Sequence, residues 1–289
     1  MTTKSNVMAT RRDNGFANQS ANNILWEVWR SRSLLKTMIW RDVKTRFAGS
    51  ALGLLWAFLQ PLCMMAILWF VFTYGLKTTP AGPGVSFVAW FFPAQIAWNF
   101  LQEGILGGAG AVTDYSFLVR KVNFKVELLP VVKIGSSLIF HGIFLLIVVS
   151  ILLTAGIRPS WTWLMIPYFT FAAAIFLLGV SWITSSLTVL FRDVQQFLSI
   201  LTQLGFWMTP IIWRADMLPE SMRAWLALNP IFYVTEGYRV AFTGQASNSP
   251  WSWEIVPWHG AIFWGLTLGF FVFGQIIFRR LRRHFGDIL

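Results

Sequence analysis

Charged residues are scarce in this sequence: they make up 12% of its 289 residues, against about a quarter in soluble domains. Cysteine occurs once, as Cys63, so the chain cannot form an internal disulfide. The histidines His141, His259 and His284 are too scattered to have the spacing of metal ligands. No GxxxxGK(S/T) stretch is present, so the usual phosphate-binding loop is missing and any use of ATP would depend on another subunit.

Hydrophobic residues are abundant instead, at 56% of the chain. Six runs contain no Asp, Glu, Lys or Arg: residues 47–76, 78–102, 134–157, 159–191, 194–213 and 255–278. Each run supplies the roughly 20 residues that a membrane-spanning helix requires. The sequence therefore predicts an all-α membrane protein with six transmembrane helices.

Lysine and arginine are distributed unequally between the two sides of these predicted spans. Eighteen of the 23 lie before span one, after span two, after span four or in the C-terminal tail. The other five are on the opposite side: Lys77, Arg158, Arg214, Arg223 and Arg239. Because basic residues concentrate on the cytoplasmic side, we expect a multi-pass membrane protein with both termini in the cytoplasm. Contact with anionic lipid, and no nucleic-acid partner, then accounts for the net charge of +11.

The chain divides into three segments. Residues 1–23 are polar and lack the apolar core of a signal peptide, which predicts a flexible cytoplasmic leader. Residues 24–47 are rich in tryptophan and basic side chains and are predicted to form an amphipathic helix in the membrane interface, although Lys36 and Arg46 fall within its apolar arc. Residues 48–289 form the predicted transmembrane domain.

The connection between spans five and six, about 214–250, has the pattern of a helical hairpin. Pro219, Asn229 and Pro230 are helix-start signals, and Gly244 is a stop signal. They predict short helices near 219–228 and 230–242, of which the second is apolar but too short to span. We expect a re-entrant hairpin that dips into the membrane from outside. Glu236 and Arg239, three residues apart within it, either pair structurally or act in gating.

Two local patterns concern helix geometry. The pair Gln60-Pro61 lies inside span one, where proline removes a backbone hydrogen bond, and predicts a helix break at membrane depth. Such a break is tolerated where protein or water satisfies the freed groups. A glycine-rich patch, Gly104, Gly107, Gly108 and Gly110, follows span two and indicates close helix packing or a hinge.

Aromatic and amide side chains recur at helical spacing in spans one and five. On a helical projection, one face of each span carries the following residues: Trp56, Gln60, Cys63, Ile67, Phe70 and Tyr74 in span one, and Gln196, Ser199, Gln203, Phe206 and Pro210 in span five. Flat rings and neutral amides suit the apolar faces and hydroxyl edges of a passing sugar. The alternative is that these residues face lipid or neighbouring helices.

Two cytoplasmic loops carry compact charged elements. These are residues 117–130, FLVRKVNFKVELLP, and residues 191–196, FRDVQQ. Both patterns are explained by the concentration of basic residues on the cytoplasmic side. The alternative is docking, in which a short helix carrying Phe124 enters a groove on a soluble partner and transmits rigid-body motion.

Several segments, taken in order, resemble the permease subunit of ABC-2 type polysaccharide exporters. They are WRDVKTRFAGSALGLLWAFLQP, FLVRKVNFKVELLP, FRDVQQFLSILTQLGFWMTPIIW and NPIFYVTEGYR, and the resemblance covers roughly residues 24–289. That family moves O-antigen, capsule and teichoic-acid polymers, so the resemblance also implies the bacterial inner (cytoplasmic) membrane. The resemblance implies a non-catalytic homodimer with two copies of a cytoplasmic ABC ATPase that binds ATP and Mg, and no cofactor bound by this chain. The cargo would be a lipid-linked polysaccharide, and periplasmic export partners are compatible with it.

The resemblance also assigns roles to individual residues. For contact with the ATPase it implies Arg120, Lys121, Asn123, Phe124 and Lys125, although a proline expected near Lys125 is absent. It places Arg192 and Asp193 at the cytoplasmic mouth. For the substrate path it supports Trp56, Gln60, Phe70, Tyr74, Gln196, Gln203 and Phe206, and for the external gate Pro219, Asn229, Pro230, Glu236 and Arg239. We further hypothesise that Arg41, Lys44 and Arg46 contact the lipid headgroup of the cargo.

Two alternatives remain at this point. An ABC-2 permease for a small lipid or drug would share the fold and partner but would need fewer amides along its path. A membrane glycosyl or acyl transferase would need an acid/base cluster, and acidic residues gather only in the external segment, as Asp216, Glu220, Glu236 and Glu254.

Overall fold

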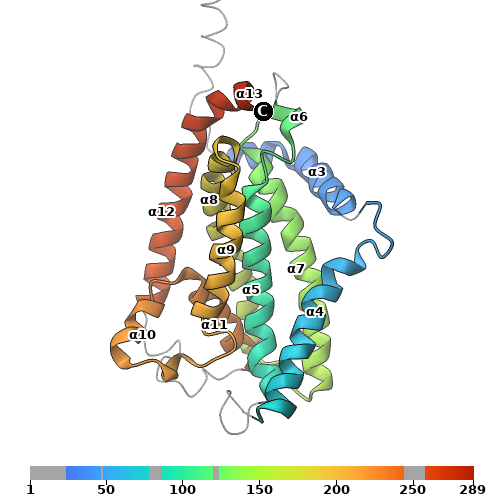
Figure 1. Cartoon of the computed structure of the whole chain (residues 1–289), viewed down its shortest axis with the longest axis vertical. Coiled ribbons are helices and arrows are strands. Elements are labelled where there is room, and N and C mark those ends of the chain that lie inside the picture. The colour runs from blue at the N-terminus through green and yellow to red at the C-terminus, as the bar shows by residue number, and fades with distance from the viewer. Residues whose placement is uncertain (1–23, 47, 78–85, 120–123, 244–257) are drawn as a thin grey trace, which may run out of the picture.

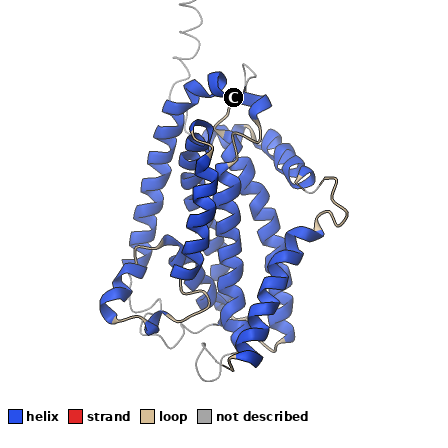
Figure 2. Cartoon of the chain, viewed as in Figure 1, coloured by secondary structure: helices blue, strands red, loops and turns tan. Residues whose placement is uncertain are grey.

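The computed structural model describes residues 24–46, 48–77, 86–119, 124–243 and 258–289, and this part of the chain is helical without strands (Figures 1 and 2). The N-terminal half contains α2 (Ile24–Arg30), α3 (Arg32–Thr45), α4 (Leu55–Phe70) with the π-helical turn η1 (Val71–Gly75), α5 (Phe87–Ala109), α6 (Ser116–Val119) and α7 (Leu128–Thr154). The C-terminal half contains η2 (Trp161–Met165), α8 (Ile166–Leu190), α9 (Asp193–Met208), η3 (Ala215–Met217), α10 (Glu220–Leu226), α11 (Pro230–Thr243), α12 (Trp258–Leu281), η4 (Arg282–His284) and α13 (Phe285–Ile288).

Four helical stretches of the described chain are long and apolar enough to cross a membrane: Leu55–Gly75, Leu128–Thr154, Trp161–Leu190 and Trp258–His284. They coincide with predicted spans one, three, four and six. Predicted spans two and five correspond to α5, of 23 residues, and α9, of 16 residues. Their crossing of the membrane, and with it the count of six, stays a prediction.

The long helices form a bundle with different elements at its two ends (Figure 1). The helices α3, α6 and α13 lie at one end, which we call the basic end. The short helices α10 and α11 lie toward the other, which we call the hairpin end. The interface helix predicted over 24–47 is divided at Ser31 into α2 and α3. The predicted hairpin helices are present as α10 and α11, while their insertion into a membrane stays a prediction.

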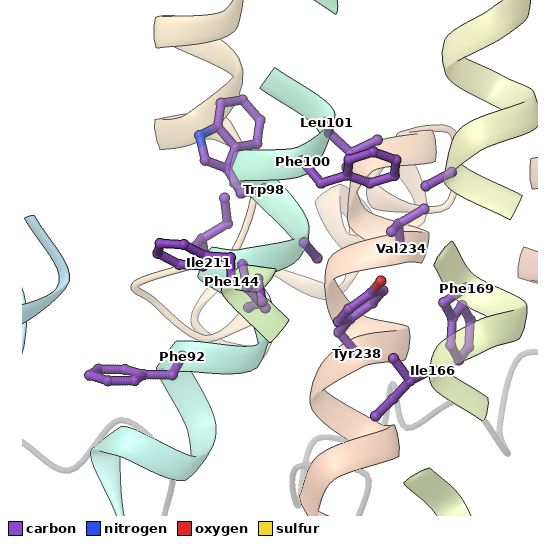
Figure 3. Packing of buried hydrophobic residues seen from close by; sticks show 14 of the residues in the cluster. Phe92, Trp98, Phe100, Leu101, Phe144, Ile166, Phe169, Ile211, Val234 and Tyr238 are labelled. Carbon is purple, nitrogen blue, oxygen red and sulfur yellow. The ribbon is translucent and has the colours of Figure 1, made fainter. Parts of the chain in front are cut away.

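Helix α5 is the centre of the bundle and packs against α7, α8, α9 and α11. Its sequence is mostly hydrophobic, with the polar residues Gln95, Asn99, Gln102 and Glu103 at the spacing of one helical stripe. Phe91, Ala94 and Leu101 are fully buried. Figure 3 shows Phe100 and Leu101 on the side of α5 that faces Val234 of α11, whereas Trp98 points to the other side of the helix. The hairpin is therefore attached to the central helix.

Glycines set the closest helix contacts. A Cβ on Gly108 of α5 would lie 2.0 Å from the Ser181 Oγ of α8, and one on Gly104 would lie 2.5 Å from Leu177. The glycine-rich patch thus serves packing, as one of its two interpretations predicted. At Gly179 of α8, a Cβ would lie 2.7 Å from the backbone nitrogen of Phe271 on α12.

The helix break predicted at Gln60-Pro61 is wrong. Helix α4 runs without interruption from Leu55 to Phe70, with Pro61 inside it, and the irregular turn comes later, at Val71–Gly75. Proline fixes φ near −65°, which is a helical value, and costs one backbone hydrogen bond. In a helix packed against neighbours this loss need not end the helix.

We predict that Gly179→Ala lowers the free energy of unfolding by about 1–3 kcal/mol, because the new Cβ meets the backbone of α12, which cannot move aside cheaply. Gly142→Ala on α7 is the control, since no atom lies within 4 Å of its Cβ position. Thermal unfolding in detergent measures both variants. Equal melting temperatures would contradict a tight α8–α12 contact.

Candidate functional site

Helix α4 packs through one face and exposes the other. Phe58, Leu62, Met65 and Trp69 of α4, continued by Phe72 of η1, form the inner face, on which Met65 is fully buried. The predicted path residues of α4 are displaced from these by two positions, or about 200° around the helix. They point away from the bundle and are exposed: Trp56 (48%), Gln60, Phe70 (58%) and Tyr74. Leu55, Leu59 and Met64 are exposed as well, so exposure extends beyond the predicted stripe.

Helix α9 shows a similar division. Leu198 and Thr202 are buried toward α5, whereas Gln196 and Gln203 are exposed. Phe206 differs from its expected neighbours because it is half-buried, with its ring 5.6 Å from that of Trp98. Helices α4 and α9 each contact α5 and lie on different sides of it (Figure 1). One protomer therefore does not bring the two predicted path faces together.

The exposed amides of these faces have no intramolecular partner within the described part of the chain. Neither Gln60 nor Gln203 makes a hydrogen bond there. A side-chain amide that faces hydrocarbon without a partner costs roughly 2–7 kcal/mol. Such residues are better accommodated by water or by another polypeptide than by lipid.

At the basic end, a cluster of polar side chains joins α3 to α7 and to the loop after α5. We call it the Asp42 cluster: Asp42, Asp114, Tyr115, Lys133 and Ser136. Asp42 is 6% exposed. Its Oδ1 accepts hydrogen bonds from Tyr115 Oη at 2.7 Å and Lys133 Nζ at 2.8 Å, and its Oδ2 accepts one from Ser136 Oγ at 2.6 Å. Lys133 Nζ also lies 2.9 Å from Asp114 Oδ2.

The surroundings of Asp42 determine its charge. Burial raises the pKa of this carboxyl, but the hydrogen bonds and charge of Lys133, with those of Ser136 and Tyr115, outweigh burial and hold the pKa below its ordinary value of 3.8. Burial and the neighbouring Asp42 carboxylate raise the pKa of Tyr115. Asp42 is therefore an anion, and Tyr115 a neutral donor, at neutral pH.

The predicted ATPase-contacting loop is described in part. Arg120, Lys121 and Asn123 lie outside the described residues. Phe124 is half-buried beside the α3 core residues, and Lys125 Nζ lies 2.8 Å from Glu27 Oε1 of α2.

The residues that follow this loop are held by the C-terminal tail. Glu127 pairs with Arg282, and the Glu127 carbonyl accepts a hydrogen bond from Trp182 Nε1 at 3.2 Å. Phe285 of α13 is fully buried in the same region. Residues 124–127 are thus anchored to α2 through Lys125 and to η4 through Glu127.

The three residues predicted to contact the lipid headgroup differ in whether they form an ion pair. Arg41 and Lys44 are exposed, with the Lys44 ammonium 5.5 Å from the Trp40 ring centroid. Arg46 instead pairs with Glu103 of α5, and its guanidinium lies 5.1 Å from the Phe140 ring centroid. This pairing explains why a cation interrupts the apolar arc of the interface helix.

The residues predicted for the cytoplasmic mouth, Arg192 and Asp193, are exposed at the start of α9. In the described chain neither forms an ion pair. Their gating role stays a prediction.

At the hairpin end, Arg239 of α11 is 2% exposed and joins three parts of the chain. Its Nε donates to the Trp90 carbonyl of α5 at 3.0 Å, and its Nη2 donates to the carbonyls of Pro210 at 3.0 Å and Ile211 at 3.2 Å. It also pairs with Glu236, and its guanidinium lies 4.1 Å from the Trp90 ring centroid. The Glu236–Arg239 pair is therefore present, as the structural interpretation expected, and it fixes α11 to α5.

The other predicted gate residues mark helix starts. Asn229 Oδ1 accepts a hydrogen bond from the Ile231 N–H at 3.0 Å, which caps α11 at Pro230. Asn229 Nδ2 donates to Thr209 Oγ1 at 3.0 Å, so the cap also holds the end of α9. Pro219 is exposed and precedes α10.

Sequence reasoning missed two buried polar groups. For the Asp42 cluster, the sequence offered a signal that could have predicted an ion pair. Asp42 is the only acidic residue of α3, and Lys133 lies near the start of a span. The second group links His141 Nε2 to Tyr238 Oη at 2.8 Å, and Tyr238 Oη in turn to Thr170. These residues belong to α7, α11 and α8, so no local sequence pattern predicts that they meet.

We predict that Lys133→Met lowers the free energy of unfolding by about 3–5 kcal/mol, because it leaves the Asp42 carboxylate buried without its cation. Adding Asp42→Asn should restore part of the loss. The pKa of Asp42 should rise in Lys133→Met, so this variant should regain stability relative to wild type as the pH falls from 8 to 5. Thermal unfolding across that range tests the sign, and a constant difference would contradict it.

The proteins to which this chain is similar are membrane transport proteins. The ABC-2 type transporter family matches residues 33–243. An O-antigen export system permease protein of Myxococcus xanthus is 29% identical over 75% of this chain and 82% of its own. One of Klebsiella pneumoniae is 27% identical over 89% of this chain and 95% of its own, and a polysialic acid transport protein of Escherichia coli is 22% identical over 72% and 80%. The described residues include four apolar helices long enough to cross a membrane, and this chain belongs to the ABC-2 type transporter family.

Proposed function

We propose that this chain is the non-catalytic transmembrane subunit of an ATP-driven exporter that moves lipid-linked polysaccharide from the cytoplasmic to the outer side of the inner membrane. The observation that carries the proposal is the similarity to O-antigen export permeases over as much as 89% of the chain. The family match over residues 33–243 supports the transporter class.

The chemistry of the α4 and α9 faces supports a carbohydrate cargo. Both faces are exposed and carry amides, and α4 adds the rings of Trp56, Phe70 and Tyr74. Rings stack on the apolar faces of sugars, and amides bond hydroxyls without fixed charge. In a homodimer, α4 and α9 of two protomers would line one path between them, which would give Gln60 and Gln203 the wet surroundings that they require.

The basic end would face the cytoplasm and two copies of an ABC ATPase. Closure of the ATPase on ATP would move the loop that ends in Phe124 and Lys125. The Lys125–Glu27 pair would pass this movement to α2, and the Asp42 cluster ties α3 to α7. At the other end, α10 and α11 would form the external gate.

The alternatives are supported less well. A permease for small lipids or drugs would gain nothing from exposed amides on α4 and α9. A transferase would need unpaired acids, but Asp216 pairs with Arg214 and Glu236 with Arg239. Glu220 is exposed, and Glu254 lies outside the described residues.

We predict that the tagged chain, extracted in mild detergent, copurifies with an ATPase at equal stoichiometry and hydrolyses ATP. Replacement of residues 120–125 by Gly and Ser should remove the ATPase, since it removes the charged element and Phe124. Arg158→Ser, at the opposite side of the predicted topology, is the control. A chain that always purifies alone would reject the exporter.

We predict that Gln60→Leu with Gln203→Leu reduces polymer export by about 10-fold, because two amide contacts at about 0.5–1.5 kcal/mol each are lost along the path. Gln275→Leu makes the same change on α12, away from the proposed path, and should export normally. Surface polymer per cell, at matched membrane levels of the chain, is the measurement. Export at wild-type level by the double variant would remove these residues from the path.

A further inference from the structure

A groove of about 610 Å³ lies between the α2–α3 segment and α7. Its volume is within the roughly 300–1,000 Å³ of small-molecule sites. Its floor is apolar and includes Leu35 and Ile39 from α3 and Val131 and Ile139 from α7. Gly135 allows the close approach of the two helices there, because a Cβ on it would lie 2.5 Å from Ile39 Cδ1.

Two cations, Arg32 and Lys36, line this groove, and none of its lining residues is acidic. Both are exposed and lie one helical turn apart on α3. Neither forms an ion pair within the described residues, unlike Arg46 and Lys133 nearby. The Arg32 guanidinium lies 5.0 Å from the ring centroid of Trp29, which is an aromatic contact and leaves its charge without a carboxylate. An apolar floor with two cations that lack a carboxylate partner is complementary to a molecule with an apolar chain and an anionic head.

The position of the groove indicates a ligand from the membrane. Val131, Gly135 and Ile139 lie in the N-terminal half of α7, which is long and apolar enough to span. Trp29 and Trp40 also line the groove and are exposed, as is typical of side chains at headgroup depth. Gly135 and Ile139 belong to the charge-free run of predicted span three, so the groove begins at the membrane edge of that predicted span.

We propose that this groove binds one anionic glycerophospholipid of the adjacent leaflet, with an acyl chain along α7 and the phosphate between Arg32 and Lys36. The lipid fills the space between the interface helix and the bundle. It is distinct from the exported cargo, because no lining residue belongs to α4 or α9, whose faces form the proposed path. The proposal does not rest on the export function.

The test uses the full-length chain, delipidated in detergent and titrated with phosphatidylglycerol or phosphatidylcholine of identical acyl chains. Native mass spectrometry counts the lipid bound. We expect tighter binding of phosphatidylglycerol and, in Arg32→Gln with Lys36→Gln, a loss of that preference of about 10-fold or more. Arg280→Gln with Arg283→Gln makes the same change of charge on exposed residues outside the groove and should keep the preference.

A second variant tests whether the apolar floor of the groove binds the acyl chain. Ile139→Trp fills the floor and should weaken both lipids; if it fails to fold, the charge variants still decide. If the Arg280/Arg283 double variant lost the preference for phosphatidylglycerol as much as the Arg32/Lys36 double variant, the proposal would be overturned in favour of general surface attraction. Preferential displacement of phosphatidylglycerol by undecaprenyl phosphate would overturn it in favour of the carrier lipid of the cargo.

Discussion

The buried carboxylate of Asp42 must be paired, and its pairing organises the basic end of the protein. A charge that is 6% exposed needs a cation and hydrogen bonds to remain ionised. Lys133, Ser136 and Tyr115 supply them from α7 and from the loop after α5. This cluster therefore attaches α3 to α7 and to the loop after α5, while the Arg46–Glu103 pair attaches the end of the same segment to α5.

At the hairpin end it is a buried cation, Arg239, that must be paired and hydrogen-bonded. Arg239 is buried, and three backbone carbonyls together with Glu236 satisfy it. These carbonyls belong to α5 and to the turn after α9, so α11 cannot move without them. Helix α5 thus connects both ends of the molecule, through Trp90 to Arg239 and through Glu103 to Arg46. A rigid central helix with polar attachments at its two ends suits a protein that transmits movement across a membrane.

Between these ends, α4 and α9 leave polar surface uncovered. Amides on the outside of apolar helices are costly in lipid, which is why the exposed Gln60 and Gln203 favour a second protomer and a wet path. The same argument applies to Arg32 and Lys36, whose unpaired charges border an apolar groove. In both places, the function proposed follows from polar groups that the described chain itself does not satisfy.

The sequence by itself determined the helical class, four helices long and apolar enough to span, the approximate limits of α10 and α11, and the spacing that allows Glu236 to pair with Arg239. Each of these depends on residues that are close in sequence: charge-free runs, start signals such as Asn229, or a spacing of three. Only the tertiary structure decided that Asp42 meets Lys133, 91 residues away, and that Arg239 meets the carbonyl of Trp90, 149 residues away. It also decided that α4 continues through Pro61 and that Phe206 turns toward Trp98. Helical periodicity says which residues share a face, but the neighbour that the face meets depends on how distant helices pack.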